Sequence, residues 1–506
     1  MAKKILLISS SFEEISLVTA SEKQKAGAKT TDESHYPVGI AYLHAYLESQ
    51  GHEIKSLFLN NRSFSDCLET VSSDVKTFEP DIVGFQILTP NRISSYRLIE
   101  HLHEFNPDIQ LVAGGIHATL MHRQLIEKYP YLIVVLGEGE ITLAELAAKY
   151  DGSTESLGQI DGLAFLKDHQ VITTNRRKLI ENLDELPLPK HEVFFHDNRA
   201  SASILTARGC PFNCSFCCLD VLSQRRVRKR SVASIITEIE WLKNKFPQLK
   251  KIWIHDDTFF IDTKRVIEFC DEIVKRNIKL QFTCSGRVKP ISAEMVKKLE
   301  QAGFTKVLLG LESGDEEILK RCHKNITQQD VIDAFKLFAK TKISVYAFLI
   351  IGLPGETLET VLNTVRFVQK IQRIKYVYYN EDVAILSVYP GTEVYEIAKA
   401  GGMINDEYWL TDKPTPIFTL ESDYSQLLKF KNYLLDRISL DRYFTLAGFR
   451  AQFWMTPYII KYLIINKSIL FTLSYKFLHK VMPKKIFLIL KQSYKILRNK
   501  NHEKIN

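Results

Sequence analysis

The 506-residue sequence lacks any uninterrupted apolar run of about 18 residues, the length that a membrane-spanning helix requires. It also lacks the marks of a secretory signal peptide, because the short apolar run in MAKKILLISSS is followed by polar residues without a small-residue cleavage site. Internal repeats and low-complexity segments are absent as well. The lack of a spanning segment and of an export signal predicts a cytoplasmic protein. With 45% apolar and 25% charged residues, a chain of this length is expected to form two or three globular domains.

The charge is unevenly distributed along the chain. The net charge is +8, but residues 442–506 carry thirteen Lys and Arg against one acid, so this segment contributes +12 and the remainder −4. A mildly acidic body argues against a nucleic-acid partner. In the tail, one helical face is apolar and comprises Phe487, Leu490, Tyr494 and Leu497. This basic amphipathic helix is expected either to pack on the protein body or to make peripheral contact with an anionic membrane.

Residues 1–150 alternate short apolar runs with amphipathic stretches, a pattern typical of repeated β/α units. The apolar runs lie at 3–9, 53–59, 81–88, 109–115 and 132–140. This spacing predicts a flavodoxin-like, doubly wound α/β domain with its ligand at the carboxyl ends of the strands. One long polar connection, residues 10–36, fits no element and has the length of a functional lid.

Residues 151–195 are predicted to be a linker that contains a hairpin, DGLAFLKDHQVITTN. A second series of strands and helices follows over 196–425, with apolar strands such as SILTA, KKIWI and VYAFLII. This series predicts a partial or complete (β/α) TIM-type barrel with its chemistry at the carboxyl ends of the strands. Residues 426–506 are predicted to be a helical, basic C-terminal region.

Four of the eight cysteines fall within nine residues, in ARGCPFNCSFCC, which suits a metal site better than a disulfide framework. Cys210, Cys214 and Cys217 have C-x3-C-x2-C spacing, and three thiolates can hold three irons of a cubane cluster while the fourth iron stays open. The alternatives are unrelated buried cysteines or a structural zinc site with Cys218 as fourth ligand, although adjacent cysteines chelate one ion poorly. The other cysteines are expected in the core: Cys67, Cys270, Cys284 and Cys322.

The cysteine spacing, with Phe216 before the last cysteine, resembles the cluster loop of the radical S-adenosylmethionine (SAM) superfamily, and the resemblance extends over roughly residues 195–400. It implies a [4Fe–4S] cluster on Cys210, Cys214 and Cys217, with SAM bound at the open iron. The motifs IHDDTFF, CSGRVKPI, LGLESGD and IIGLPGET resemble the family's positions that meet the SAM amine, carboxylate, ribose and adenine, respectively. The SAM contacts implied in this way are Phe216, Asp256, Asp257, Arg287, Glu312, Ser313, Gly352 and Pro354.

The first domain resembles the cobalamin-binding domains that precede many radical SAM cores, most clearly in GGIHATLMHRQLIEKYPYLIVVLGEGE. Glycines in this block would leave strand ends bare, so that a flat macrocycle could lie close to them. The cobalamin contacts implied are Gly114, Gly115, His117, Thr119, Gly137, Glu138 and Gly139. No D-x-H-x-x-G motif is present, which implies cobalamin without a protein histidine on cobalt. A domain that keeps the fold and has lost the cofactor is the alternative.

The resemblance implies that SAM is cleaved to a 5′-deoxyadenosyl radical and that cobalamin donates a methyl group to an unactivated carbon. It further implies an electron donor such as flavodoxin or ferredoxin and a small-molecule, lipid or natural-product substrate. No general acid or base is assigned. A cobalamin-dependent oxidative cyclase or rearrangement enzyme and a non-enzymatic cobalamin or cluster sensor remain alternatives. A methylthiotransferase is disfavoured, because only Cys67 lies upstream of the cluster loop.

Overall fold

The computed structural model describes residues 2–12, 36–60, 62–194, 200–379 and 383–443. The chain divides into a compact unit, Met1–Ser439, and a second unit, Leu440–Asn506. The predicted amphipathic tail helix and most of the 10–36 connection lie outside the described residues. Within the part of the chain that the structure describes, no helix is both long and apolar enough to cross a membrane.

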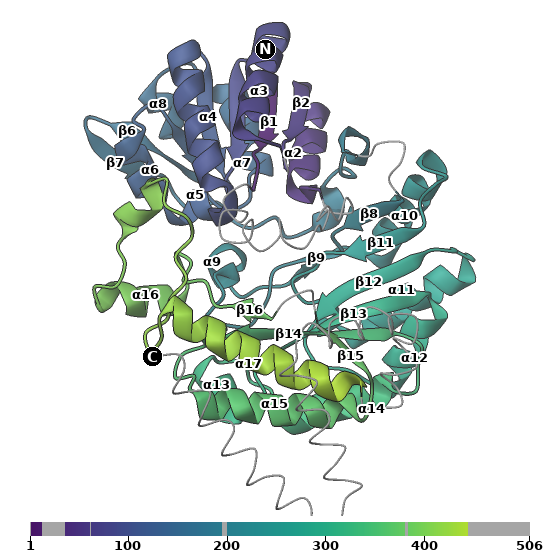
Figure 1. The fold of residues 1–506 in the computed structure, drawn as a ribbon. Helices are drawn as coiled ribbons and strands as arrows, with labels where there is room; N and C mark the ends of the chain where they lie inside the picture. Colours follow the sequence, from purple (N-terminus) through teal and green to yellow (C-terminus); the bar gives the residue numbers. More distant parts are fainter. Residues whose placement is uncertain (1, 13–35, 61, 195–199, 380–382, 444–506) are drawn as a thin grey trace, which may run out of the picture. The chain divides into compact units, whose positions relative to one another are not determined.

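The first sheet, drawn in purple to blue in Figure 1, contains five parallel strands. Their order is β2-β1-β3-β4-β5. They are β1 (Lys4–Ser9), β2 (Glu53–Phe58), β3 (Ile82–Gln86), β4 (Gln110–Gly114) and β5 (Ile133–Val135). This is the flavodoxin-like order, in which the direction of winding reverses between β1 and β3 and leaves a crevice at the carboxyl ends. The predicted fold of this domain is confirmed.

Helices cover both faces of this sheet. Alternate residues of each strand point to opposite sides, and both sides are apolar, so each face has to be shielded from water. In β1, Ile5 and Leu7 join one apolar cluster, while Leu6 and Ile8 join the other. The first cluster contains residues of α2 (Val38–Ser49) and α7 (Glu140–Lys149). The second contains residues of α3 (Phe64–Phe78), α4 (Arg92–Phe105), α5 (Ile116–Leu120) and α6 (His122–Lys128).

The hairpin predicted within residues 151–195 is present as β6 (Leu163–Lys167) and β7 (Gln170–Thr173). It follows the short helix α8 (Thr154–Leu157), and β6 pairs antiparallel with β5. Residues 163–173 therefore extend the first sheet, so the predicted linker is only partly a connection. The pairing was not visible in the sequence, because it depends on an edge that β5 leaves open.

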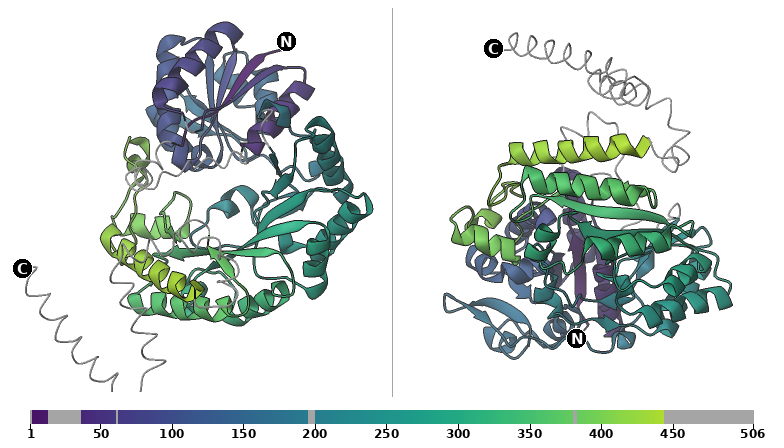
Figure 2. Two further views of the ribbon diagram at one scale, coloured as in Figure 1. Left: turned by 45° about the vertical axis from the view of Figure 1, so that its right-hand side comes forward. Right: turned by 90° about the horizontal axis from the view of Figure 1, so that it is seen from below.

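The second sheet is built of parallel strands that follow one another in chain order (Figure 2). They are β8 (Ser201–Ile204), β11 (Lys251–Ile254), β12 (Gln281–Gly286), β13 (Phe304–Glu312) and β14 (Ser344–Ile351), with β15 (Val377–Tyr379) and β16 (Ala384–Ile385) both pairing with β14. Among the described residues, β8 does not pair with β15 or β16, so the barrel stays open. The sequence left a partial or a complete barrel possible, and the structure is partial.

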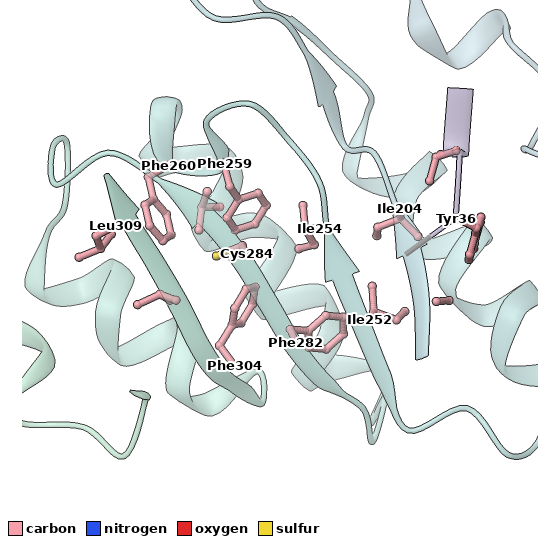
Figure 3. Packing of buried hydrophobic residues seen from close by; sticks show 14 of the residues in the cluster. Tyr36, Ile204, Ile252, Ile254, Phe259, Phe260, Phe282, Cys284, Phe304 and Leu309 are labelled. Atoms are coloured by element: carbon pink, nitrogen blue, oxygen red, sulfur yellow. The ribbon is translucent and has the colours of Figure 1, made fainter. Parts of the chain in front are cut away.

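The crossover helices cover the outside of this open barrel, as expected for parallel β/α units. They are α10 (Val232–Lys245), α11 (Thr263–Lys275), α12 (Ala293–Gln301), α13 (Glu316–Arg321), α14 (Gln328–Phe338), α15 (Leu358–Gln372) and α16 (Glu393–Ala400). Between sheet and helices lies an aromatic core in which Phe282 stacks on Phe304 with ring centroids 5.3 Å apart (Figure 3). Cys67, Cys270, Cys284 and Cys322 are buried, which confirms their predicted place in the core.

Two C-terminal segments complete the described structure. Helix α17 (Tyr424–Tyr443) buries Leu427, Leu434 and Ile438 in the main core. The short helix η5 (Asp406–Leu410) buries Trp409 in the apolar cluster that also holds one face of the first sheet. The two sheets therefore share apolar cores and form parts of the same compact unit.

Candidate functional site: the cluster loop and the cavity beside it

The cysteine loop follows β8 and a two-residue strand, β9 (Ala207–Arg208), which pairs with β10 (Arg228–Lys229). Gly209 opens the loop with a φ of +97°, and a Cβ there would lie 2.1 Å from the Arg226 carbonyl oxygen. Only glycine fits such a turn. The loop ends in the short helix α9 (Leu219–Ser223). All three predicted iron ligands therefore lie at the carboxyl end of the first barrel strand.

The three thiols share this loop and are partly buried. Burial raises the pKa of Cys210, and burial with the neighbouring cysteines raises that of Cys217 to about 12. Among the described residues, no three His, Cys, Asp or Glu side chains form a ready-made metal site. The donor set fits the cluster in chemistry rather than in a preformed geometry, because iron binds thiolates and binding itself would drive off the protons.

Arg287, at the end of β12, provides a second test of fit. Its Nη1 donates to Cys214 Sγ at 3.6 Å, and its guanidinium lies 3.8 Å from the centroid of the Phe212 ring. The side chain is 6% exposed, yet Nε and Nη2 have no hydrogen-bond partner. A buried cation with two unused donors next to the cysteines suits an anionic ligand, as the predicted contact with the SAM carboxylate requires.

The two adjacent aspartates after β11 support the root of the loop. Asp256 accepts hydrogen bonds from the backbone N–H of Thr206 at 2.6 Å and of Ala207 at 3.0 Å, and Asp257 accepts one from Gly209 N–H at 2.9 Å. Burial raises the pKa of Asp256 to about 6 and also raises that of Asp257. The sequence assigned both carboxylates to the SAM amine, but the structure uses them first to fix the loop backbone. Asp256 in particular is buried beneath it.

Glu312 and Ser313 stand at the carboxyl end of β13. Glu312 has a φ of +61° and is held by Lys324, whose Nζ lies 2.6 Å from Oε1, with both side chains buried. Ser313 Oγ lies 3.1 Å from Thr364 Oγ1. Phe216, from the cluster loop, packs against a small apolar cluster that contains Leu353. The sequence reasoning missed Lys324, although its position shortly after the LESG motif was visible.

The glycine motif after β14 forms a tight turn. Gly352 has a φ of +91°, and its N–H donates to Glu356 Oε2 at 2.5 Å. Burial raises the pKa of Glu356 to about 8, because the N–H from Gly352 only partly offsets the loss of solvent. Pro354 lies in the same turn and is partly exposed. The turn thus presents backbone at the barrel rim, and its role beside the SAM adenine stays a prediction.

A cavity of about 270 Å³ lies between the carboxyl edge of the first sheet and the root of the cluster loop. The predicted cobalamin contacts on its wall are Gly114, Gly115, Gly137, Glu138 and Gly139. From the other side Arg208, Gly209 and Asp257 contribute. A Cβ on Gly137 would meet nothing within 4 Å, whereas one on Gly115 would clash with the Ile87 carbonyl oxygen at 2.8 Å. A bare, largely apolar wall suits a broad ring cofactor.

Two predicted contacts have internal roles instead. His117 is fully buried, with Nδ1 3.1 Å from Thr89 Oγ1 and Nε2 2.7 Å from Tyr96 Oη. Burial lowers its pKa to about 3, so it is a neutral packing residue and does not line the cavity. Thr119 Oγ1 accepts a hydrogen bond from Gly137 N–H at 3.1 Å and so shapes the cavity indirectly. The GG-x-H motif could not reveal that the His117 side chain points inward, because the direction of that side chain depends on how the domain packs.

Glu138 connects the cavity wall to the cluster loop. Its carboxylate lies 3.1 Å from Arg208 and 2.6 Å from Arg228, and Glu140 lies 2.7 Å from Arg208. Burial opposes the charge on Glu138, but the Arg228 hydrogen bond and both guanidinium charges lower its pKa below the usual value. Sequence reasoning missed both arginines, although Arg208 stands in ARGC directly before the first cysteine and Arg228 lies in the basic run RRVRKR after the last one.

An open β/α barrel with a three-cysteine loop at its rim, joined to a flavodoxin-like domain with a glycine-lined cavity, defines an enzyme of the radical SAM type with a second cofactor-binding domain. A profile of the radical SAM superfamily matches residues 204–368, and a profile of the B12 binding domain matches residues 25–147. An uncharacterized methyltransferase of Pyrococcus horikoshii is 31% identical over 411 residues, which cover 80% of this chain and 85% of that protein. The chain therefore belongs to the radical SAM superfamily, among its members with an N-terminal B12-binding domain. Its cofactors are a [4Fe–4S] cluster, SAM and cobalamin.

Other relatives are enzymes of related chemistry. The anaerobic magnesium-protoporphyrin IX monomethyl ester cyclase of Rubrivivax gelatinosus is 30% identical over 352 residues, covering 65% of this chain and 61% of that protein. Among solved structures, the cobalamin-dependent SAM radical enzyme OxsB has a TM-score of 0.67 at 16% identity, covering 98% of this chain and 75% of that one. The radical SAM methyltransferase TsrM of Kitasatospora setae has a TM-score of 0.62 at 20% identity, covering 79% and 76%. These two structures establish the shared fold.

Proposed function

We propose that this protein is a cobalamin-dependent radical SAM methyltransferase that transfers a methyl group to an unactivated carbon of a small-molecule substrate. The observation that carries the proposal is the direct contact between the two cofactor regions. Glu138 on the cavity wall lies 3.1 Å from Arg208, two residues before the first cysteine of the cluster loop. A methyl carrier and a radical source must serve one substrate carbon, so their sites have to adjoin.

When bound, the cluster supplies the electron that cleaves SAM to the 5′-deoxyadenosyl radical, and cobalamin supplies the methyl carrier. The chain holds and orients these groups. Cys210, Cys214 and Cys217 bind iron, and Arg287 offers two unused donors to the anionic end of SAM. The glycines of the first sheet admit the ring of cobalamin. Because the cavity is lined largely by apolar and glycine residues, it also limits water near the reacting groups.

The proposal includes an external one-electron donor such as flavodoxin or ferredoxin, since reductive cleavage of SAM consumes an electron that no described residue supplies.

The proposal also places the enzyme in the cytoplasm, with peripheral membrane contact through the basic tail. Adding anionic vesicles at low and high salt tests the tail. Salt-sensitive binding that is lost when residues 444–506 are removed would support membrane contact, and unchanged binding would refute it.

The reaction is tested with anaerobically purified, cluster-reconstituted protein, cobalamin, a reductant and SAM labelled in its methyl group. Formation of 5′-deoxyadenosine with label in a product supports methyl transfer. Formation of 5′-deoxyadenosine with an altered but unlabelled product supports the second candidate, oxidative cyclisation or rearrangement, which the similarity to the anaerobic cyclase favours. Absence of 5′-deoxyadenosine from fully loaded protein would refute both enzymes and favour a sensor.

A further inference from the structure

The strongest unexplained feature beside the site is a buried ion pair. Lys324 and Glu312 are 5% and 7% exposed, and Lys324 Nζ lies 2.6 Å from Glu312 Oε1. Removing two charges from water costs free energy that their mutual attraction has to offset, so a buried pair of this kind is weak evidence for added stability, and a role in fixing a geometry has to be argued from its surroundings. We propose that Lys324 is a positioning residue that fixes the Glu312 carboxylate for binding SAM.

The backbone around Glu312 is strained in a way that requires a restraint. Glu312 has a φ of +61°, and the pairing of β13 with β14 slips between Gly310 and Glu312. A non-glycine residue in the left-handed region at a strand end persists only when its surroundings impose it. The bond to Lys324 supplies that restraint, because it holds the carboxylate at the barrel rim.

The neighbouring residues make room for the pair. A Cβ on Gly310 would lie 2.5 Å from Glu312 Oε1 and 2.8 Å from Lys324 Nζ. The turn that carries Lys324 is equally specialised, since the residues on either side of it, His323 and Asn325, have φ values of +54° and +52°. This turn directs the lysine inward rather than to solvent.

The same turn also contacts the cluster loop. The carbonyl of Cys322 accepts a hydrogen bond from Ser215 N–H at 3.1 Å, and Ser215 follows the iron ligand Cys214. Cys322 is also buried in one small apolar cluster with Leu353 of the glycine motif, against which Phe216 of the cluster loop packs. One turn therefore links the cluster loop, the glycine motif and Glu312, which are the three places where SAM is expected.

This inference rests on the proposed SAM-cleaving function, and its test begins with SAM binding rather than turnover. Isothermal titration of SAM into anaerobic, cluster-loaded protein is compared for wild type, Lys324→Met, Glu312→Gln and the double variant. We expect Lys324→Met to weaken SAM binding roughly 10- to 100-fold, because it leaves Glu312 buried without its partner. Iron and sulfide content should stay unchanged, since Lys324 does not ligate the cluster.

The double variant separates positioning from a structural role. If Lys324 acts through Glu312, Lys324→Met causes no further loss of SAM affinity in the Glu312→Gln background. At the same time, the double variant should recover the thermal stability that each single variant loses, because no unpaired buried charge remains. Restored stability without restored SAM affinity is a result that a merely structural ion pair would not give.

Lys298→Met is the matched control, since Lys298 pairs with Asp271 on the outside of the barrel and should leave SAM affinity unchanged. Unaltered SAM affinity in Lys324→Met, or additive losses in the double variant, would overturn the inference while leaving the proposed function intact. If wild-type protein with a full cluster binds no SAM, the proposed function fails, and the inference fails with it.

Discussion

The two parallel sheets of this protein offer opposite chemistries at their carboxyl edges. The first sheet presents bare backbone, with Gly114 and Gly137 on the wall of an apolar cavity. The second presents charged and thiol groups: Arg287 donates a hydrogen bond to Cys214, and Glu312 pairs with Lys324. The first edge is suited to hold a cofactor by shape, and the second by coordination and charge.

This difference follows from what each cofactor needs. A broad ring gains most from close van der Waals contact, which side chains at the strand ends would prevent. A cluster and a zwitterionic ligand need specific atoms at specific places, and those are expensive to bury unless they are partnered. We therefore expect the first edge to be sensitive to added volume and the second to lost polar groups.

The largest effect should come from removing an iron ligand. Cys214→Ala leaves two thiolates in the loop, so the cluster should be lost and 5′-deoxyadenosine formation should fall below detection. Iron analysis, visible absorbance and product chromatography measure both effects. Cys218→Ala is the control and should keep the cluster, and retained cobalamin binding in Cys214→Ala would show that the first edge works independently. A cluster that survives in Cys214→Ala would contradict the assignment.

Adding volume to the first edge should have the next largest effect. Gly114→Val places its Cβ no closer than 3.8 Å to any protein atom, so the fold should tolerate it while the side chain fills the cavity. We expect cobalamin affinity to fall about tenfold or more with the cluster content intact. Spectroscopic cobalamin titration measures this, with Gly158→Val, at a site outside the cavity, as control. Equal cobalamin affinity in both variants would show that the ring does not lie on Gly114.

Breaking the link between the two edges should have an intermediate effect. Glu138→Gln removes the charge that pairs with Arg208 and Arg228, at a cost of about 3 kcal/mol in unfolding free energy. Because the cofactor regions lose their common anchor, methyl transfer should fall several-fold more than 5′-deoxyadenosine formation. The ratio of methylated product to 5′-deoxyadenosine is the measurement. Glu145→Gln is the control, because it affects a more exposed pair with Arg177 and should leave that ratio unchanged. An unchanged ratio in Glu138→Gln as well would contradict a role for the link.

The smallest effect concerns pH. The pKa of Glu356 is raised to about 8, so the folded state retains its proton where the unfolded chain has lost it. The stability that the folded state gains from keeping Glu356 protonated is fully present below pH 4.5, the pKa of the unfolded chain, and is lost as the pH rises through 8. Glu356→Gln keeps an acceptor for the Gly352 N–H but cannot ionise, so its melting temperature should change less between pH 5 and 8.5 and exceed that of wild type at the upper end. Parallel pH profiles of the two proteins would contradict this.

Most of the architecture could be predicted from the sequence, because it rests on local patterns. Buried parallel strands such as KILLIS read as continuous apolar runs, and their alternation with amphipathic stretches indicated both sheets. The hairpin at 163–173 was also visible, but its pairing with β5 was not. The C-x3-C-x2-C spacing predicted the cluster loop, since three nearby ligands in one loop need no tertiary information.

The partners of the site residues could not be predicted in this way. The sequence alone determined which residue types stand at each strand end: the cysteines, the glycines, Glu138 and Glu312. Tertiary structure decided that His117 turns inward to Tyr96, that Asp256 holds the loop backbone, and that Lys324 reaches Glu312. The physical reason is that a side chain's role depends on which donors, acceptors and charges meet it after folding. Those neighbours lie on other elements, 12 to 50 residues away along the chain in these three cases, and no pattern within one element records them.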